Sequence, residues 1–152
     1  MLNPLRMGLV ELQEWLNVTG RILLVESDAV LGAVVGEVLH HSGHEVISVR
    51  TLKGQSEHIP SGSTVILDLD TVSAETELAC LSSLQLSSKP MPIVLIGLEV
   101  PEDVRDLLRT HLGRRQPKHL AWVQKPFRNE ELLAAVQRVN GSSPAGLPFS
   151  GE

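Results

Sequence analysis

The architecture of this chain follows from the stretch Thr64-Val65-Ile66-Leu67-Asp68-Leu69-Asp70. Residues 64–67 form a short apolar run preceded by Ser61-Gly62-Ser63, and such a run bounded by turn residues is typical of a buried β-strand. Asp68 then stands at the carboxyl end of the strand, where parallel α/β sheets bind their ligands. Asp is also a frequent turn residue. From this stretch alone, Asp68 is therefore either a site residue or the residue that turns the strand into the next helix.

Four further strand patterns alternate with helical patterns. Apolar runs lie at residues 22–25, 93–96 and 120–124, and residues 44–49 alternate less cleanly, with Val46, Ile47 and Val49 as their apolar residues. Apolar side chains at helical spacing lie at residues 28–43, 73–86, 101–112 and 129–139. Ser27 or Asp28 is expected to cap the first of these helices, and Thr71 or Ser73 the second. Between residues 51 and 58 we expect only a short or broken helix.

The alternation of strands and helices predicts an α/β protein with a five-stranded parallel doubly wound sheet. Glu26-Ser27-Asp28 follows the first strand where a glycine-rich phosphate loop would stand, which argues against a dinucleotide-binding fold. The acidic strand ends favour the flavodoxin-like order 2-1-3-4-5. In that order Glu26, Asp68, Gly97 and Lys125 end four neighbouring strands, spaced about 4.8 Å apart. We therefore expect them to line one crevice.

The composition is that of a globular domain. The 152 residues are 42% hydrophobic and 20% charged, and the net charge of −5 argues against a basic nucleic-acid-binding face. Cys80 is the only cysteine, so no intrachain disulfide can form, and we expect it to be a small core residue. No apolar run approaches the roughly 18 residues of a membrane span. We expect a cytoplasmic protein that binds neither nucleic acid nor membrane.

The chain is expected to divide into three parts. Residues 1–20 form an amphipathic segment with Leu5, Leu9, Leu12 and Leu16 at helical spacing. This segment either packs on the main domain, or is a poorly ordered leader, or forms a homodimer through its apolar stripe. Residues 21–140 form the domain itself. Residues 141–152 are rich in Ser, Pro and Gly, and we expect a disordered tail.

The chain resembles the receiver domain of two-component response regulators over residues 21–140. The resemblance rests on Val25-Glu26-Ser27-Asp28, Leu67-Asp68 and Lys125-Pro126-Phe127 at family-like spacing on five strands. It implies that Asp68 is a phosphoacceptor for a histidine kinase and that Lys125 pairs with it and then with the phosphoryl oxygens. It also implies a cis peptide bond before Pro126. Trp122 falls on the aromatic position that changes rotamer on activation, although it is equally well explained as a large residue covering an edge strand.

Two departures from the family pattern concern the magnesium site and the switch. Ser27 occupies the position of a second metal-binding acid, and a hydroxyl is a weaker ligand for a hard cation. Glu26 and Asp68, with Asp28 and Asp70 as further candidates, are therefore expected to bind Mg²⁺ weakly or not at all. Gly97 occupies the position of a Ser or Thr whose hydroxyl would bond the phosphoryl group, and glycine has no such donor.

These observations favour two functions. The first is a degenerate receiver, not an enzyme, that acts through contacts with a signalling partner and without obligate phosphorylation. The alternative is a conventional response regulator that is phosphorylated on Asp68 by a histidine kinase. Ser27 and Gly97 favour the first, whereas Asp68 and Lys125 support the second.

Overall fold

The computed structural model of the chain describes residues 20–55, 62–85, 91–99, 106, 108–110 and 120–140. The strands among them are β1 (Arg21–Val25), β2 (Glu45–Val49), β3 (Ser63–Asp68), β4 (Ile93–Gly97) and β5 (Leu120–Gln124). The helices are α2 (Ala29–His41), α3 (Ala74–Gln85) and α5 (Asn129–Val139). Residues 106 and 108–110 are also helical, as predicted. The predictions for residues 1–19, for the rest of the 101–112 helix and for the tail lie outside the described residues. No helix in the described ranges is long and apolar enough to cross a membrane.

The five strands form one parallel sheet in the order β2-β1-β3-β4-β5, which confirms the predicted fold class and topology. Val25 at the end of β1 lies opposite Leu67 of β3, and Asp68 lies opposite Ile96 of β4. Gly97 in turn lies opposite Gln124, the last residue of β5. The carboxyl ends of these strands therefore meet at one edge of the sheet.

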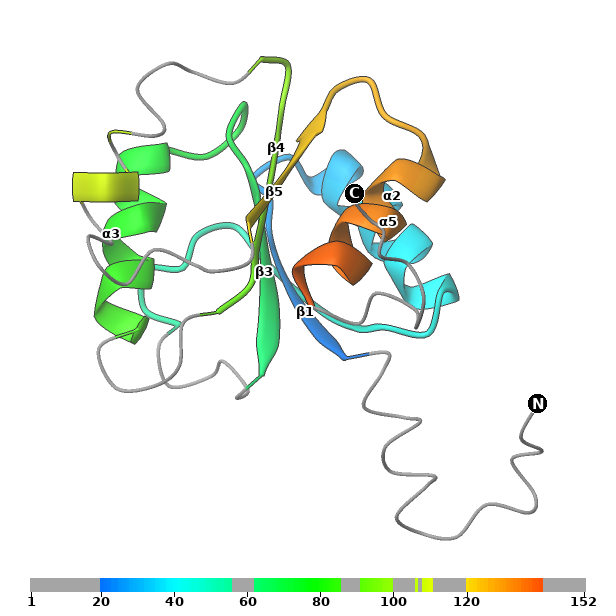
Figure 1. Cartoon of the computed structure of the whole chain (residues 1–152), viewed down its shortest axis with the longest axis horizontal. Helices are drawn as coiled ribbons and strands as arrows, with labels where there is room; N and C mark the ends of the chain where they lie inside the picture. The colour runs from blue at the N-terminus through cyan, green and yellow to red at the C-terminus, as the bar shows by residue number, and fades with distance from the viewer. Residues whose placement is uncertain are drawn as a thin grey trace, which may run out of the picture.

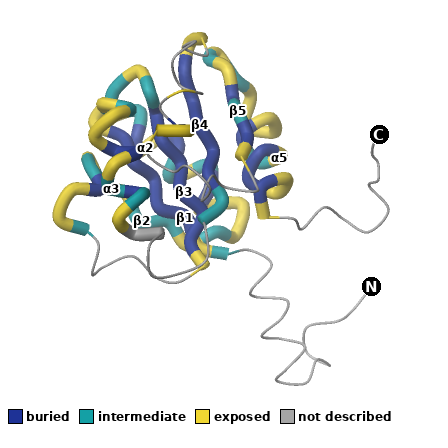
Figure 2. The backbone as a smooth tube through the Cα atoms, turned by 60° about the vertical axis from the view of Figure 1, so that its left-hand side comes forward, coloured by how far each residue is buried: buried dark blue, intermediate teal, exposed yellow. Residues whose placement is uncertain are grey.

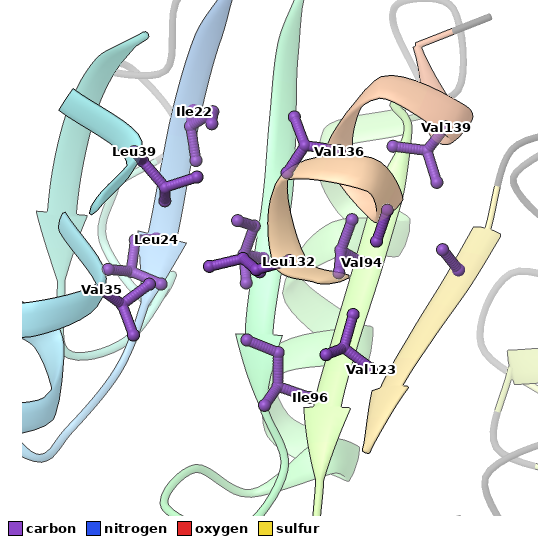
Figure 3. Close-up of a cluster of buried hydrophobic side chains, with 13 residues drawn as sticks. Ile22, Leu24, Val35, Leu39, Val94, Ile96, Val123, Leu132, Val136 and Val139 are labelled. Carbon is purple, nitrogen blue, oxygen red and sulfur yellow. The ribbon is translucent and has the colours of Figure 1, made fainter. Parts of the chain in front are cut away.

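Helices cover both faces of the sheet, with α2 and α5 on one side and α3 on the other (Figure 1). The core strands are dark blue along their length in Figure 2, because they are buried on both faces. Ile22 and Leu24 of β1 lie beside Leu39 and Val35 of α2 (Figure 3). Leu132 and Val136 of α5 belong to the same buried cluster. Leu23 and Val25 belong to the core on the α3 side. Two covered faces explain why the strands read as continuous apolar runs.

The helix ends settle two alternatives that the sequence left open. The Asp28 carboxylate accepts hydrogen bonds from the amides of Val30 and Leu31, so Asp28 and not Ser27 caps α2. At the other end Gly43 has a φ of 95°, a conformation that favours glycine where a helix terminates. The Ser73 hydroxyl accepts a hydrogen bond from the Thr76 amide at the start of α3. Thr71 instead takes part in the site described below.

The segment after β2 forms a turn over residues 51–55, and no helix begins within them. The buried carboxylate of Glu77 on α3 holds this turn: it accepts hydrogen bonds from the Thr51 hydroxyl at 2.7 Å and from the Leu52 amide at 2.6 Å. Leu52 is thereby fixed in the core on the α3 side.

Candidate functional site

Two buried carboxyl groups lie side by side at the carboxyl edge of the sheet. Glu26 directly follows β1 and is 5% exposed, and Asp68 ends β3 and is fully buried. The Glu26 Oε2 atom accepts hydrogen bonds from the Asp28 amide at 3.1 Å and from the Thr71 hydroxyl at 2.5 Å. The Asp68 Oδ1 atom accepts one from the Asp70 amide at 3.0 Å. The sheet thus brings the two predicted acids together.

The two carboxyl groups differ in protonation. Burial and the hydrogen-bonded neighbour Asp68 raise the pKa of Glu26 to about 7, against 4.5 for an ordinary Glu. Burial also opposes the ionisation of Asp68, but its hydrogen bonds with Glu26 and Lys125 outweigh burial and lower its pKa. Two adjacent carboxyls in a dry environment do not both ionise readily. Below about pH 7 they therefore share a proton that resides on Glu26, and Asp68 carries the negative charge.

Lys125 neutralises this charge. It directly follows β5, and its Nζ atom donates a hydrogen bond to Asp68 Oδ2 at 2.7 Å and lies 3.2 Å from Asp70 Oδ2. Burial opposes the ammonium charge, but the hydrogen bonds to Asp68 and Asp70 outweigh it and raise the pKa of Lys125. The Lys125–Pro126 peptide bond is cis, as the resemblance implied.

Asp70 connects Lys125 to the loop that follows β4. Besides its contact with Lys125, Asp70 Oδ2 accepts a hydrogen bond from the Leu98 amide at 3.0 Å. The Leu98 carbonyl accepts a further bond from the Gln124 side chain at 3.2 Å. The Asp70 carboxylate is thus an anion supplied by the chain itself, held by one ammonium and one backbone amide.

Gly97 and Trp122 are matched by shape. A Cβ atom built on Gly97 would lie 2.8 Å from Trp122 Cη2 and 3.5 Å from Asp70 Oδ1. The first separation is too short for any residue with a side chain unless the indole moves. Trp122 also packs against the core on the α3 side and lies on an edge strand, as one of its two interpretations anticipated.

The other residues predicted for a metal site are engaged elsewhere. The Ser27 hydroxyl donates to the Thr71 carbonyl at 2.6 Å, and the Asp28 carboxylate caps α2. Asp70 bonds Lys125 and Leu98 instead of facing Glu26. No group of three or more His, Cys, Asp or Glu side chains suited to a metal ion occurs within the described ranges. Mg²⁺ would be left with two carboxyls that share a proton, which is a poor fit.

Thr71 is a site residue that sequence reasoning missed. Its hydroxyl donates to Glu26 and lies 3.4 Å from the Ser27 amide, and its carbonyl accepts from Ser27. Thr71 therefore ties the loop after β3 to the loop after β1. The only signal in the sequence is a hydroxyl residue three places after Asp68, and this position is equally suited to a helix cap.

Comparison with known proteins gives no match to any protein-family model and none to any curated protein. Solved structures do match. Chemotaxis protein CheY4 of Vibrio cholerae has a TM-score of 0.63 at 19% identity, over 78% of this chain and 97% of that one. A response regulator of Thermotoga maritima has a TM-score of 0.59 at 15% identity, over 80% of this chain and 97% of that one.

A third structure is the receiver domain of a sensor histidine kinase of Pseudomonas aeruginosa, with magnesium coordinated in its active-site cleft. It has a TM-score of 0.59 at 20% identity and covers 80% of this chain and 97% of that one. These neighbours are receiver domains of response regulators and of a kinase. The likeness establishes that this chain has the CheY-like receiver fold.

Proposed function

We propose that this chain is a receiver-like module of a two-component signalling system that contacts its protein partner in one fixed form, without obligate phosphorylation of Asp68. The observation that carries the proposal is the Asp70 carboxylate, which lies 3.2 Å from Lys125 Nζ and accepts from the Leu98 amide. A histidine kinase is one candidate partner. The receiver fold of the neighbours supports the signalling role.

The Asp70 carboxylate already contacts the two groups that would respond to an added anion, Lys125 Nζ and the Leu98 amide. A ligand shifts a conformational equilibrium only by contacting one state better than the other. A phosphoryl group on Asp68 would compete with Asp70 for Lys125 Nζ and for the Leu98 amide. Asp70 already forms both contacts in the unmodified protein, so a phosphoryl group gains only the difference between its own contacts and those that Asp70 gives up. The phosphoryl group would therefore add little that the unmodified protein lacks.

The route from the site to β5 is also interrupted. Gly97 has no hydroxyl that could bond a phosphoryl oxygen, so no side chain at the end of β4 can report its arrival. The Trp122 indole already lies against Gly97 and fills the space a side chain there would need. These two features support one fixed arrangement of β4 and β5.

Magnesium binding is expected to be weak or absent. The described residues offer the Glu26 and Asp68 carboxyls, and below about pH 7 a cation would have to displace the proton they share. Ser27 donates its hydroxyl to Thr71 and adds no charge. We therefore assign no step of the function to magnesium.

One observation favours the second candidate, a conventional phosphoacceptor. Asp68 is ionised, with its pKa lowered, and Lys125 Nζ lies 2.7 Å from it. An ionised carboxylate paired with a lysine is a competent nucleophile for phosphoryl transfer, which depends mainly on positioning and charge neutralisation. In this function a histidine kinase would supply the phosphoryl group to Asp68.

An experiment with a small phosphodonor separates the two. The full chain and its Asp68→Ala variant, both carrying Trp15→Phe so that Trp122 alone emits, are incubated with acetyl phosphate and Mg²⁺. Mass spectrometry reports phosphorylation, and Trp122 fluorescence reports any change at β5. The proposal expects unchanged fluorescence in both proteins, whether or not wild type gains mass. A mass gain with a fluorescence change that Asp68→Ala abolishes would establish the conventional switch.

A further inference from the structure

An apolar groove lies between α2 and α5. These two helices cover the face of the sheet opposite α3 (Figure 1). The groove consists of two hollows, of about 430 and 570 Å³, that share Val34, Val38 and Asn129 in their linings. One hollow reaches Leu98 and Phe127 at the carboxyl edge of the sheet. We call the two together the α2–α5 groove.

The groove leaves large apolar side chains open to water. Val34 is 56% exposed and Leu98 is 61% exposed, and both line the groove. Outside its lining, Val30, one turn before Val34 on α2, is 75% exposed. Large exposed apolar patches on soluble proteins usually mark sites that another surface covers. Val35, next to Val34, is by contrast 4% exposed and belongs to the core.

We propose that residues 1–19 of the same chain cover the α2–α5 groove as a helix, with Leu5, Leu9, Leu12 and Leu16 against it. These leucines recur at helical spacing and form one apolar stripe, and the groove is an apolar surface that the described residues leave open. The inference does not depend on the phosphorylation state of Asp68.

The segment joins the domain next to the far end of the groove. The second hollow ends at His41 and Ser42, where α2 terminates. The chain then leads to Glu45, which lies opposite Arg21 in the sheet and donates its amide to the Gly20 carbonyl at 3.3 Å. Residue 19 is thus connected to the fold at the amino edge of the sheet, the edge at which the groove ends.

The length and direction of the segment also suit the groove. As a helix, residues 1–19 would extend about 28 Å, whereas the 13 residues of α2 extend about 20 Å. A helix that precedes β1 and returns along the sheet runs in the same direction as α2 and α5. It would therefore form a third helix in their layer, with its first residues near Leu98 and its last near Ser42.

Attachment to the same chain favours this occupant over a second copy. A tethered segment has an effective concentration in the millimolar range for short flexible connections, well above ordinary protein concentrations. An isolated helix as short as this stripe is marginal in water, which also disfavours self-pairing of the segment away from the domain. A dimer formed by the stripes alone would leave the groove uncovered.

Hydrogen exchange on the full chain tests the proposal. Wild type is compared with Val34→Lys in the groove and with Leu12→Lys in the stripe. The matched control is Ala79→Lys, an exposed residue of α3 on the other face of the sheet. We expect the amides of residues 5–16 to be protected in wild type. Val34→Lys and Leu12→Lys should each accelerate their exchange about tenfold or more, with no effect of Ala79→Lys.

Three results would overturn the inference: no protection of residues 5–16 in wild type, protection that Val34→Lys leaves intact, or protection that rises with protein concentration. The last would assign the segment to a second copy. Far-UV circular dichroism and the exchange of β3 amides establish that each variant is folded, and Val34 is exposed enough for its replacement to be tolerated by the domain.

Discussion

Replacing Glu26 with Gln should remove a pH dependence of stability that the carboxyl pair creates. In the folded protein the pKa of Glu26 is raised to about 7, whereas an ordinary Glu has 4.5. Between these two pH values the folded state holds a proton that the unfolded chain has lost. The stabilisation that this proton contributes is therefore fully present below about pH 4.5 and is lost as the pH rises through about 7. The lowered pKa of Asp68 affects stability only at pH values below 3.8, outside this window.

The magnitude follows from the size of the shift. Each pH unit by which a pKa moves corresponds to about 1.4 kcal/mol. A shift from 4.5 to about 7 therefore means that ionised Glu26 destabilises the folded state by about 3 kcal/mol. A Gln amide can donate to Asp68 as the protonated carboxyl does, and its oxygen can accept from Thr71. Glu26→Gln should therefore match wild type at acidic pH and be more stable by up to about 3 kcal/mol above neutrality.

Urea unfolding followed by circular dichroism measures this difference at about pH 5 and about pH 8. Titrations shared by both proteins cancel in the comparison. Glu130→Gln, which removes an exposed carboxylate at the start of α5, controls for the charge lost. Equal pH dependence in wild type and Glu26→Gln would refute the shared proton. A variant that is less stable than wild type above about pH 7 would show that Glu26 is needed in its ionised form.

Three further substitutions test other contacts of the site. Gly97→Ala should lower the free energy of unfolding by about 1–3 kcal/mol, because its Cβ would meet the Trp122 indole. Adding Trp122→Leu should recover most of that loss. A loss that Trp122→Leu does not relieve would contradict the contact between Gly97 and Trp122. Lys125→Met should lower the free energy of unfolding, measured in urea, by at least about 2 kcal/mol, because it leaves the Asp68 and Asp70 carboxylates without their cation. An unchanged free energy of unfolding would show that these ion pairs contribute nothing to stability. Ser27→Asp should tighten Mg²⁺ binding about tenfold in calorimetric titration, because it adds a charged oxygen ligand. Equal Mg²⁺ affinity in wild type and variant would mean that Ser27 does not weaken the binding of the ion.

Most of the fold could be predicted from the sequence because its signals are local. All five residues of β4 are buried, so the strand reads as an unbroken apolar run that ends at Gly97. Acids at the strand ends favoured the order 2-1-3-4-5, in which Glu26 and Asp68 end neighbouring strands, and the sheet has this order. The turn at residues 51–55 could not be predicted in this way, because it is held by Glu77, which is distant in the chain.

The chemistry of the site was only partly predictable, because it depends on contacts between distant segments. The sequence suggested Asp70 as a metal ligand, but its carboxylate bonds Leu98 and Lys125. The proton on Glu26 arises from burial and from Asp68, neither of which a local pattern reports. Val34 and its neighbour on α2 form one apolar pattern in the sequence, and only the structure shows that Val34 is left exposed.

The amide chemical shift of Leu98 tests most directly whether Asp70 supplies the anion that fixes this domain. Leu98 donates to Asp70 Oδ2, so its amide reports which anion holds the loop after β4. Spectra of wild type and Asp70→Ala are recorded with and without saturating acetyl phosphate and Mg²⁺, with Asp68→Ala as the control for modification at Asp68. We expect the Leu98 amide of wild type to be unmoved by the phosphodonor, and that of Asp70→Ala to differ from wild type before any addition. A wild-type Leu98 amide that shifts on phosphorylation, and does not shift in Asp68→Ala, would contradict the account.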